Sequence, residues 1–328
     1  MFLFVVRRLL ISIPILLLAS VMVFLLVLAS GDPLEDVKGR PNNEVQVQQL
    51  TRLYNLDKGP VQRYFLWFSG FVRGDFGKDR SGQEVRPQLF RAMSLTLRLI
   101  LIAQFLAVIL GLTVGVISAV RQYSAFDYAA TGLSFLFFAM PVFWFAVLLK
   151  EFGAIRLNDQ LESWGFSRWI GTVGPQTPNF AGSFWARMGD YAGHMILPII
   201  TLTLISYAGY SRFTRASMLD TMSSDYVRTA KAKGLSSRRV ILRHGFRNAL
   251  IPVTTIVALD FGALLGGAII TESVFAWQGM GKFLVDAITK IDPNKAMAWF
   301  MVTAVLVVVF NIVADIAYAY LDPRIRLD

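Results

Sequence analysis

The chain has 328 residues, of which 55% are hydrophobic and only 16% are charged, and its formal net charge is +10. Soluble globular domains carry about 25% charged residues, so this composition predicts a membrane protein. The chain has no cysteine and only two histidines, His194 and His244. This excludes disulfides, thiolate catalysis and metal sites built from cysteines or several histidines.

The first apolar segment runs for 22 residues, from Leu9 to Ser30, without a charge. At about 1.5 Å per residue, a helix of this length crosses a hydrocarbon core of about 30 Å. A cleaved signal peptide is the alternative, because Arg7 and Arg8 precede the segment and small residues end it. The apolar run exceeds the roughly 7 to 15 residues of a signal peptide, so we expect an uncleaved anchor.

Five further apolar segments approach spanning length, which predicts an all-α membrane fold with six transmembrane helices. The segment 195–210 is the shortest, and we expect its helix to continue through 211–218 into the cytoplasm. The five segments are Leu95–Val120, Tyr128–Leu149, Met195–Tyr210, Ala249–Ile270 and Trp299–Tyr320.

The distribution of charge predicts the orientation. Lys and Arg concentrate in loops that stay in the cytoplasm. Segments 1–8, 121–127, 211–248 and 322–328 together hold 14 basic and 5 acidic residues, whereas the remaining loops are nearly balanced. We therefore expect both termini to be cytoplasmic. The positive charge is explained by topology, and no nucleic-acid partner is expected.

The predicted organisation has three parts: the N-terminal end with the first span (1–30), a large external region (31–94) and a core with five spans (95–328). In the external region, apolar and aromatic residues repeat at helical spacing between Val61 and Val72. This stripe lies either on the outer bilayer surface or against the helical bundle. The second external loop, 150–193, is Gly- and Trp-rich and is expected to be a connector with interfacial tryptophans.

The cytoplasmic loop 211–250 carries the most informative pattern. Gly234 divides two helical segments, and it can adopt a left-handed conformation that ends the first helix, while Ser236 or Ser237 can cap the second. Small residues would allow the first helix to approach a partner closely, and basic residues would meet acidic groups. The segment comprises Arg228, Thr229, Ala230, Lys231, Ala232, Lys233, Gly234, Leu235 and Ser236, followed by Arg238 and Arg239.

Composition alone leaves a second interpretation of this loop equally open. Basic residues next to a membrane also bind anionic lipid headgroups, at about 1 kcal/mol for each Lys or Arg.

The run DYVRTAKAKGLSSRRVILRHGFRNALIP, from Asp225 to Pro252, resembles the coupling loop of permease subunits in ABC importers of the oligopeptide/dipeptide group. Further similar stretches occur in the expected order along nearly the whole chain: RGDFG from Arg73, HMILPIITL from His194, SRFTRASML from Ser211, TESVFAWQGMG from Thr271 and YLDPRIRL from Tyr320. The general importer consensus has Glu-Ala-Ala where this chain has Arg228, Thr229 and Ala230. The acidic residue is missing here, as in the peptide group.

The resemblance implies a type I importer permease in a bacterial inner membrane. Its partners would be a second homologous permease, two cytoplasmic ATPases and an external substrate-binding lipoprotein. The loop from Arg228 to Ser236 would dock on one ATPase, so that ATP-driven closure alternates access to a peptide pathway. Dipeptides, oligopeptides, glutathione-like compounds and nickel complexes are all substrates of permeases of this general type.

No cofactor is expected on this chain, and no catalytic site. The nearest resemblance to a phosphate-binding loop ends in Gly281 and Lys282, but Phe283 replaces the required Ser or Thr and Ala276 replaces the first Gly. ATP and Mg²⁺ would therefore bind to the partner ATPases.

Three polar residues lie inside predicted spans, where such groups are costly. Asp260 is central in the fifth span, and Asn311 and Asp315 share one face of the sixth at spacing i, i+4. They could line the translocation path, contact the sister permease, or pair with Arg98 or with cytoplasmic arginines. Gly111 with Gly115, and Gly262 with Gly266, are small-residue pairs that favour close helix packing.

Two other classes compete with an importer permease. A secondary transporter would use Asp260 and Asp315 to couple to an ion gradient, but such proteins often contain internal repeats, and the two halves show none that is convincing. A scaffold or assembly factor would fit the topology alone. Neither class explains the loop around Gly234.

Overall fold

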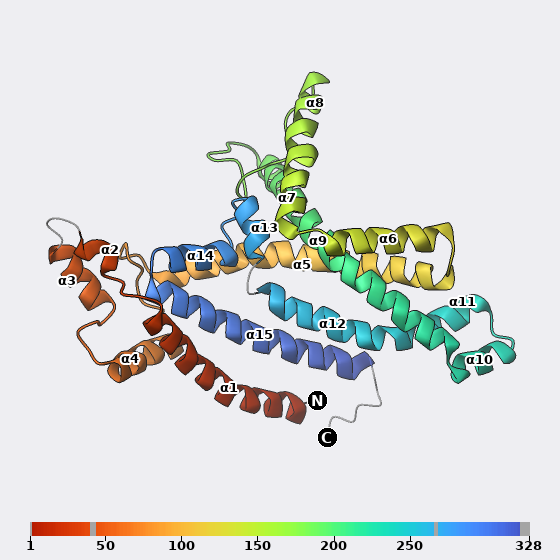
Figure 1. The fold of residues 1–328 in the computed structure, drawn as a ribbon, viewed down its shortest axis with the longest axis horizontal. Coiled ribbons are helices and arrows are strands. Elements are labelled where there is room, and N and C mark those ends of the chain that lie inside the picture. Colours follow the sequence, from red (N-terminus) through yellow and green to blue (C-terminus); the bar gives the residue numbers. More distant parts are fainter. Residues whose placement is uncertain (1, 40–43, 266–267, 322–328) are drawn as a thin grey trace. The chain divides into compact units, whose positions relative to one another are not determined.

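The computed structural model describes residues 2–39, 44–265 and 268–321, and the regular secondary structure of these residues is helical apart from one isolated β-bridge between Lys78 and Glu84 (Figure 1). The long helices are α1 (Phe2–Ala29), α5 (Val85–Val120), α6 (Ala125–Ala139), α9 (Phe184–Ser223), α12 (Arg247–Leu265) and α15 (Pro293–Leu321). The shorter ones are α2 (Glu35–Lys38), α3 (Glu44–Leu53), α4 (Pro60–Val72), α7 (Val142–Lys150), η1 (Glu151–Arg156), α8 (Leu157–Ser163), α10 (Asp225–Ala232), α11 (Ser237–Arg239), η2 (Val240–Phe246), α13 (Ile269–Val274) and α14 (Met280–Thr289).

The chain forms two compact units. The first unit contains Met1–Thr96, Leu265–Ile269 and Gln278–Val309, and the second contains Leu97–Leu264, Ile270–Trp277 and Phe310–Asp328. Helices α5 and α15 contribute residues to both units.

Four helices in the described part of the chain are long and apolar enough to cross a membrane: Val5–Ala29, Val85–Val120, Phe184–Ser223 and Pro293–Val313. They correspond to the first, second, fourth and sixth predicted spans. The fourth is a single helix of 40 residues, which confirms that it continues well beyond 195–210.

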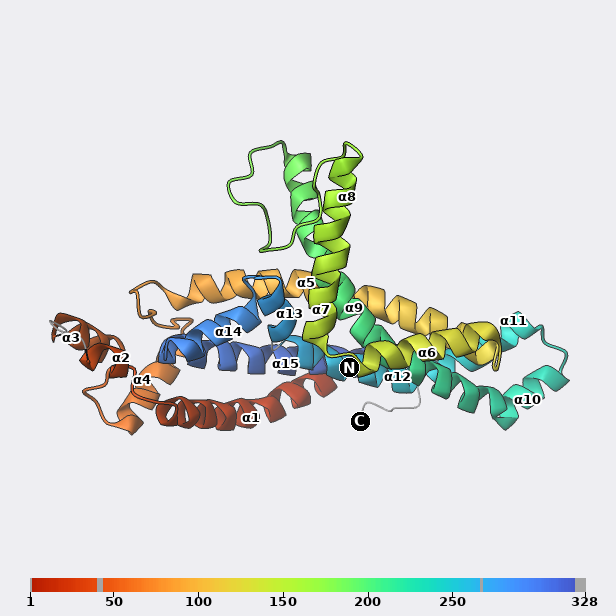
Figure 2. The ribbon, with the colours of Figure 1, turned by 45° about the horizontal axis from the view of Figure 1, so that its top comes forward.

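The third predicted span is broken rather than continuous. Helices α6 and α7 meet at Met140 and Pro141 and bend by 103° between Ala125–Ala139 and Val142–Ser163 (Figures 1 and 2). Both Met140 and Pro141 have extended ψ angles, of 126° and 131°. A proline disfavours the helical conformation in the residue before it, and the span predicted over Tyr128–Leu149 is interrupted at this point.

The fifth predicted span corresponds to α12, which has 19 described residues, from Arg247 to Leu265. It is not among the four helices that meet the length and apolarity criterion in the described residues. With the bent pair counted as one span, the described part of the chain has up to five candidates.

Close packing of α5 on α9 explains two glycines of the second unit. A methyl group on Gly111 would lie 2.5 Å from Tyr210 Cβ, and one on Gly115 would lie 2.6 Å from Thr214 Cβ. Both positions therefore require glycine, which confirms the packing role predicted for this pair. In the other pair, Gly266 lies outside the described residues.

The loop predicted to be the second external one is attached to the start of α9 by polar contacts. Trp169 Nε1 donates to the Gly189 carbonyl at 3.0 Å, and the backbone N–H of Thr177 donates to Asp190 at 2.9 Å. His194 Nδ1 lies 3.0 Å from the Gly174 carbonyl oxygen. The loop is therefore fixed on the N-terminal turns of α9.

The core of the first unit joins the loop before α5 to the helices α14 and α15. Phe76, Leu89, Phe283 and Trp299 are buried there, and Trp299 Nε1 donates to the Met280 carbonyl at 2.8 Å. A smaller cluster of Leu34, Val37, Leu50 and Tyr54 holds α2 on α3.

Candidate functional site

The segment that follows α9 begins a new helix at a sharp change of backbone direction. Helix α9 ends at Ser223, and Ser224 is extended (φ −70°, ψ 153°) before α10 starts at Asp225. The amphipathic α10 is short, with eight residues, so tertiary packing rather than helix propensity must hold it in place.

Gly234 ends this helix in the way the sequence predicts. Its φ is +74°, in the left-handed region. The N–H of Gly234 donates to the Lys231 carbonyl at 2.9 Å, and that of Leu235 donates to the Ala230 carbonyl at 3.4 Å. These two bonds form a Schellman motif. The predicted helix, turn and second helix are thus confirmed as local structure, whereas the coupling role remains a prediction.

The cap predicted for the second helix is only partly present. Ser236 occupies the N-cap position of α11 with an extended backbone (φ −60°, ψ 143°), but its side chain makes no capping hydrogen bond. The helix continues into η2 and then α12, so packing further along the chain stabilises it.

One face of α10 is buried within the chain itself. Val227 and Ala230 pack against Val240 of η2, with Leu235 and Met222 at the edge of the cluster. The expectation that Ala230 offers a small surface to a partner was therefore wrong. A small residue is needed at position 230 because Val240 of η2, which follows the turn, packs against it.

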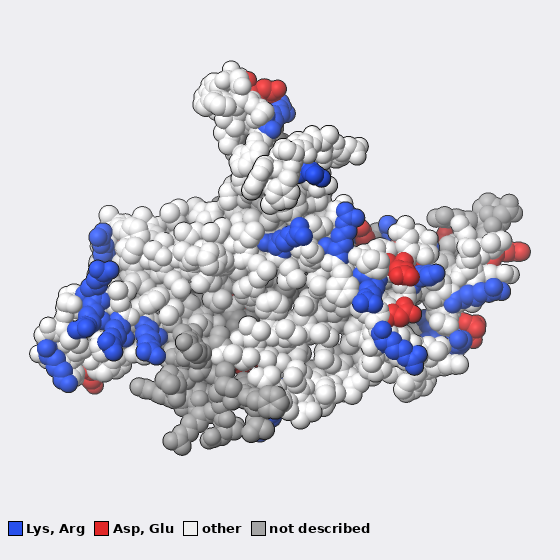
Figure 3. All heavy atoms as spheres, turned by 180° about the vertical axis from the view of Figure 1, so that it is seen from behind, with Lys and Arg blue, Asp and Glu red and all other residues white. Residues whose placement is uncertain are grey.

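The opposite face is exposed and basic. Arg228, Thr229, Lys231, Ala232, Lys233 and Gly234 are exposed, Leu235 is half-buried, and Ser236, Arg238 and Arg239 are exposed. Lys and Arg side chains gather over α10 and α11 in the space-filling view (Figure 3). The structure therefore offers a partner the basic groups and Thr229 and Ala232, but not Ala230.

Arg228 is already engaged locally. Its guanidinium lies 3.4 Å from the Asp225 carboxylate and donates to the Ser223 carbonyl at 3.2 Å. Both side chains of the ion pair are highly exposed, and such pairs contribute about 0 to 1 kcal/mol. Arg228 remains accessible to an acidic group on another protein.

A buried ion pair supports the base of this segment. Arg215 of α9 donates to both carboxylate oxygens of Asp127 in α6, at 2.6 and 2.8 Å. The Asp127 side chain is almost fully buried, and it also accepts from the Tyr123 backbone N–H at 2.9 Å. Sequence reasoning missed this pair because 88 residues separate its members and no local pattern links them.

Further contacts bind the end of α9 to α12 and η2. The Ser217 hydroxyl donates to the Ala249 carbonyl at 2.9 Å, and Met218 and Ala249 are buried together with Ala119 of α5. These contacts join the end of α9, which leads into α10, to α5 and α12.

Asp260 lies in a polar chain across three helices of the second unit. Gln104 of α5 donates through Nε2 to the Tyr210 hydroxyl of α9 at 2.8 Å, and both side chains are fully buried. The Tyr210 hydroxyl in turn interacts with the Asp260 carboxylate of α12. Asp260 is partly buried.

The other two polar residues predicted for the path have different surroundings. Asn311 in α15 is exposed, whereas Asp315, one turn later, is partly buried. Next to them, Phe310 stacks on Phe261 of α12 with ring centroids 5.3 Å apart. This contact packs α15 on α12 near Asp260.

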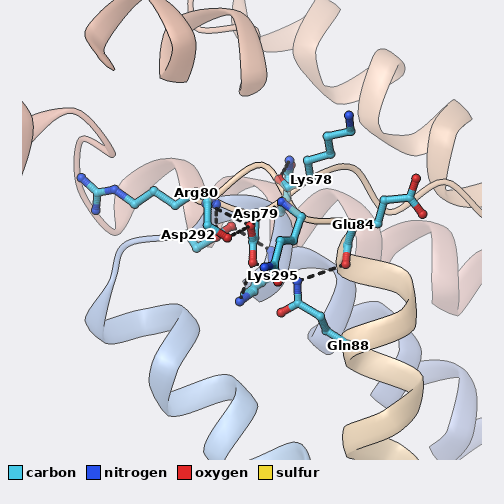
Figure 4. A network of polar contacts seen from close by, with 10 residues as sticks. Lys78, Asp79, Arg80, Glu84, Gln88, Asp292 and Lys295 are labelled. Carbon is cyan, nitrogen blue, oxygen red and sulfur yellow. Dashed lines mark hydrogen bonds and ion pairs between the residues drawn. The ribbon is translucent and has the colours of Figure 1, made fainter. Parts of the chain in front are cut away.

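The first unit contains a polar cluster around Asp79 that no sequence pattern predicted (Figure 4). Asp79 accepts from the Ser81 hydroxyl at 2.7 Å, the Gln83 N–H at 2.9 Å, Gln88 Nε2 at 2.9 Å and Lys295 Nζ at 3.0 Å. Burial alone would raise the pKa of Asp79, but the hydrogen bonds from Ser81, Gln88 and Lys295 lower it well below its ordinary value.

Asp292 completes the cluster from the turn before α15. It accepts from the backbone N–H groups of Arg80 at 2.9 Å and Lys295 at 3.1 Å, and burial raises its pKa. Arg80 also donates to the Lys290 carbonyl at 2.7 Å and to Asp36 at 3.1 Å. The cluster fixes the loop that follows RGDFG, in the predicted external region, on the start of α15.

Comparison with known proteins places this architecture in a family. Residues 111–327 match the family described as binding-protein-dependent transport system inner membrane component. The chain belongs to this family. It is 37% identical to the oligopeptide transport system permease protein AppB of Bacillus subtilis, covering 98% of this chain and 99% of that protein. It is 37% identical to OppB of Mycobacterium tuberculosis, with 99% of both chains covered, and 34% identical to the dipeptide transport system permease protein DppB of Escherichia coli, with 98% of both covered.

A solved structure supports the fold of this inner membrane component. It is titled as inward-facing conformations of the MetNI methionine ABC transporter, and the alignment has a TM-score of 0.51 at 15% identity. It covers 72% of this chain and 96% of that chain. The likeness establishes the type I importer permease fold alone.

The family membership fixes the general role of the inner membrane component. It is a multi-pass membrane protein and a transport subunit rather than an enzyme. A binding-protein-dependent system implies a substrate-binding partner and an ATPase partner on other chains.

Proposed function

We propose that this chain is one of two homologous permeases that form the pore of an ATP-driven peptide importer. The observation that supports this most strongly is similarity along 98 to 99% of the chain to permeases named for oligopeptide and dipeptide transport. Oligopeptides are the favoured substrates, because the relatives of 37% identity carry that name.

The complete assembly would contain a second homologous permease, two cytoplasmic ATPases that bind ATP and Mg²⁺, and an external substrate-binding lipoprotein. The chain would cross the bacterial inner membrane six times, with both termini in the cytoplasm. The bent α6–α7 pair and α12 would supply the third and fifth spans. The division at residues 30 and 94 would separate the first span and the external region from the permease core.

The α10 segment would dock on one ATPase and couple its closure to the pore. Three features support this role: the rigid Schellman turn at Gly234, the exposed basic groups Lys231 and Lys233, and the buried contacts that join the segment to α9 and η2. An isolated lipid-binding loop would not need such a fixed connection to the spanning helices.

The polar residues Asp260, Asn311 and Asp315 would lie on or near the translocation path. The exposure of Asn311 in the described chain favours contact with substrate or with the sister permease. The contact of Asp260 with Tyr210 instead favours a positioning role for that carboxylate.

Two measurements test this proposal. The tagged chain is first extracted from its native membrane with mild detergent, and the proteins that remain bound are identified. Recovery of a second permease and of ATPases with phosphate-binding loops supports the importer. Recovery of the chain alone, under conditions that preserve other importers, contradicts it and favours a gradient-driven transporter.

The purified complex is then placed in proteoliposomes with ATP inside and labelled peptides outside. The double variant Lys231→Glu/Lys233→Glu should lose peptide uptake and peptide-stimulated ATP hydrolysis together. Arg121→Glu is the matched control, since Arg121 is an exposed basic residue in the predicted cytoplasmic turn before α6. Equal loss in both variants would indicate a general charge effect and would contradict specific docking by α10.

A further inference from the structure

Helix α4 has two apolar faces, although it follows the first predicted span and lies outside the six predicted spans. Tyr64 and Trp67 pack on Phe24 of α1, with ring centroids 5.5 and 6.2 Å apart. The α1 and α4 helices lie side by side in both ribbon views (Figures 1 and 2). This face accounts for only part of the apolar surface of α4.

The second apolar face is exposed. Val61, Phe65 and Val72 are 70%, 63% and 68% exposed, and Phe68 between them is partly exposed. Their spacing of four, three and four residues places all of them on one side of the helix. A contiguous apolar stripe of this kind on an exposed helix marks contact with a membrane or another protein.

The position at which α4 contacts α1 favours lipid, rather than another protein, as the neighbour of this stripe. The Tyr64 hydroxyl lies 2.8 Å from the Ser20 hydroxyl. Ser20 precedes the end of α1 at Ala29 by nine residues, which corresponds to about 13 Å along a helix axis. A single leaflet contributes about 15 Å of hydrocarbon. The contact therefore lies well below the level at which α1 leaves the apolar layer.

The stripe also continues the exposed apolar surface of a candidate span. Helix α1 is a candidate span with only 17% of its apolar window buried, and its side chains Leu18 and Met22 are exposed at the level of Ser20. The other side of α4 faces a cavity of about 750 Å³, which Arg63 and Gly70 line together with the apolar Leu66 and Trp67 and with the basic Arg52 and Arg73. The helix thus has an aqueous side and an acyl-chain side.

We propose that α4 inserts its Val61–Phe65–Phe68–Val72 stripe among the lipid acyl chains of the leaflet that surrounds the C-terminal end of α1. The occupant of this surface is lipid hydrocarbon, and not a sister subunit or a soluble partner. The external region is thereby anchored in the bilayer by a second element besides α1. This inference rests on family membership and on the contacts of α4, and it does not depend on the substrate or on the coupling role of α10.

The chain contains no cysteine, so one introduced cysteine gives a single labelling position in this chain, and no native cysteine has to be replaced. The stripe positions are Val61→Cys, Phe65→Cys and Val72→Cys. Gln62→Cys and Ser69→Cys are matched controls on exposed positions of the same helix outside the stripe, and Leu18→Cys is the lipid-facing reference on α1. Each labelled complex, purified from native membranes, is reconstituted in lipid nanodiscs.

Collision of each label with oxygen, which concentrates in acyl chains, is compared with collision with a water-soluble nickel chelate. The proposal predicts an oxygen-to-nickel ratio at the three stripe positions that is several-fold higher than at residues 62 and 69 and approaches that at residue 18. A ratio at the stripe equal to that at the controls would overturn it by placing the stripe in water. Low collision with both reagents would also overturn it, because a protein would then cover the stripe.

Discussion

Arg215 in α9 donates two hydrogen bonds to the buried carboxylate of Asp127 in α6, at 2.6 and 2.8 Å, across 88 residues of sequence. The fork geometry of a guanidinium suits this arrangement, and a lysine could not reproduce it. The pair joins α6 to α9, ten residues before α10 begins at Asp225.

Removal of the Arg215 side chain should destabilise the second unit. In Arg215→Ala, the buried Asp127 charge loses its partner, and the expected cost is about 3 kcal/mol. Arg215→Lys should cost less because the charge is retained. Thermal unfolding of the purified complex measures both. Arg228→Ala is the control, since its exposed pair with Asp225 should contribute no more than about 1 kcal/mol; equal effects at positions 215 and 228 would contradict the distinction.

Ala230 and Ala232 should respond differently to a larger side chain. Ala230→Phe forces a ring into the cluster of Val227 and Val240 and should cost about 1 to 3 kcal/mol, whereas Ala232 is exposed and should tolerate the change locally. Limited trypsin cleavage at Lys231 and Lys233 reports the opening of α10. Unchanged cleavage of Ala230→Phe would show that Ala230 is not packed as described.

Changes at Gly234 should follow its left-handed conformation. No atom lies within 4 Å of an added Cβ, so Gly234→Ala should cost only about 1 kcal/mol for its φ of +74°. Gly234→Pro fixes an incompatible φ and removes the N–H that donates to Lys231, at about 3 kcal/mol. Hydrogen exchange of the Leu235 amide reports the opening of the turn in both variants. In Gly234→Ala, the amide of residue 234 can be followed as well. Similar exchange of Leu235 in Ala and Pro variants would contradict this order.

The Asp79 cluster should make the first unit sensitive to pH. The pKa of Asp79 is lowered on folding, so its stabilising contribution is full above the unfolded value of about 3.9 and is lost as the pH falls through the folded pKa. Asp292 has the opposite effect on stability. Its pKa is raised by burial, so its protonation as the pH falls removes the free-energy cost of burying its charge.

Replacement of Asp79 separates these two effects. Asp79→Asn should destabilise the first unit by about 3 kcal/mol at neutral pH, because Lys295 loses its buried partner. The difference from the wild type should shrink only below about pH 4. Denaturation in mixed micelles across this pH range measures the difference, and a constant difference down to the lowest pH tested would contradict the assignment.

Asp260→Asn should retain most of the activity if the carboxylate positions Tyr210. An amide oxygen can still accept from the Tyr210 hydroxyl, whereas Asp260→Leu removes the acceptor and should impair assembly of the α5, α9 and α12 contact. Peptide uptake and complex yield are measured together. Loss of uptake in Asp260→Asn with normal yield would instead assign the charge itself to the translocation path.

Features set by a few neighbouring residues could be predicted from sequence. The turn at Gly234 is one, because only its own backbone conformation and the adjacent helices decide it. Apolar length likewise predicted α1, α5, α9 and α15. The fold and the family followed from colinear motifs, which constrain the whole chain at once.

Features that depend on distant partners were not predictable. The burial of Ala230 is decided by Val240, which returns only after the turn. The Asp79–Lys295 contact joins residues 216 positions apart. The apolar segment Tyr128–Leu149 likewise did not reveal the break at Pro141, because several other helices continue through a proline.

The 40 residues of α9 form one helix, which corresponds to a rod of about 60 Å. Its first turns hold the predicted second external loop, and its last turn leads directly into α10. A rod that pivots near its midpoint acts as a lever, so that a tilt of about 5° displaces each end of a rod of this length by roughly 2 to 3 Å in opposite directions. In such a rotation of α9 as one body, a displacement of Ser223 would be accompanied by an opposite displacement of Gly189 and Asp190, which hold Trp169 and Thr177.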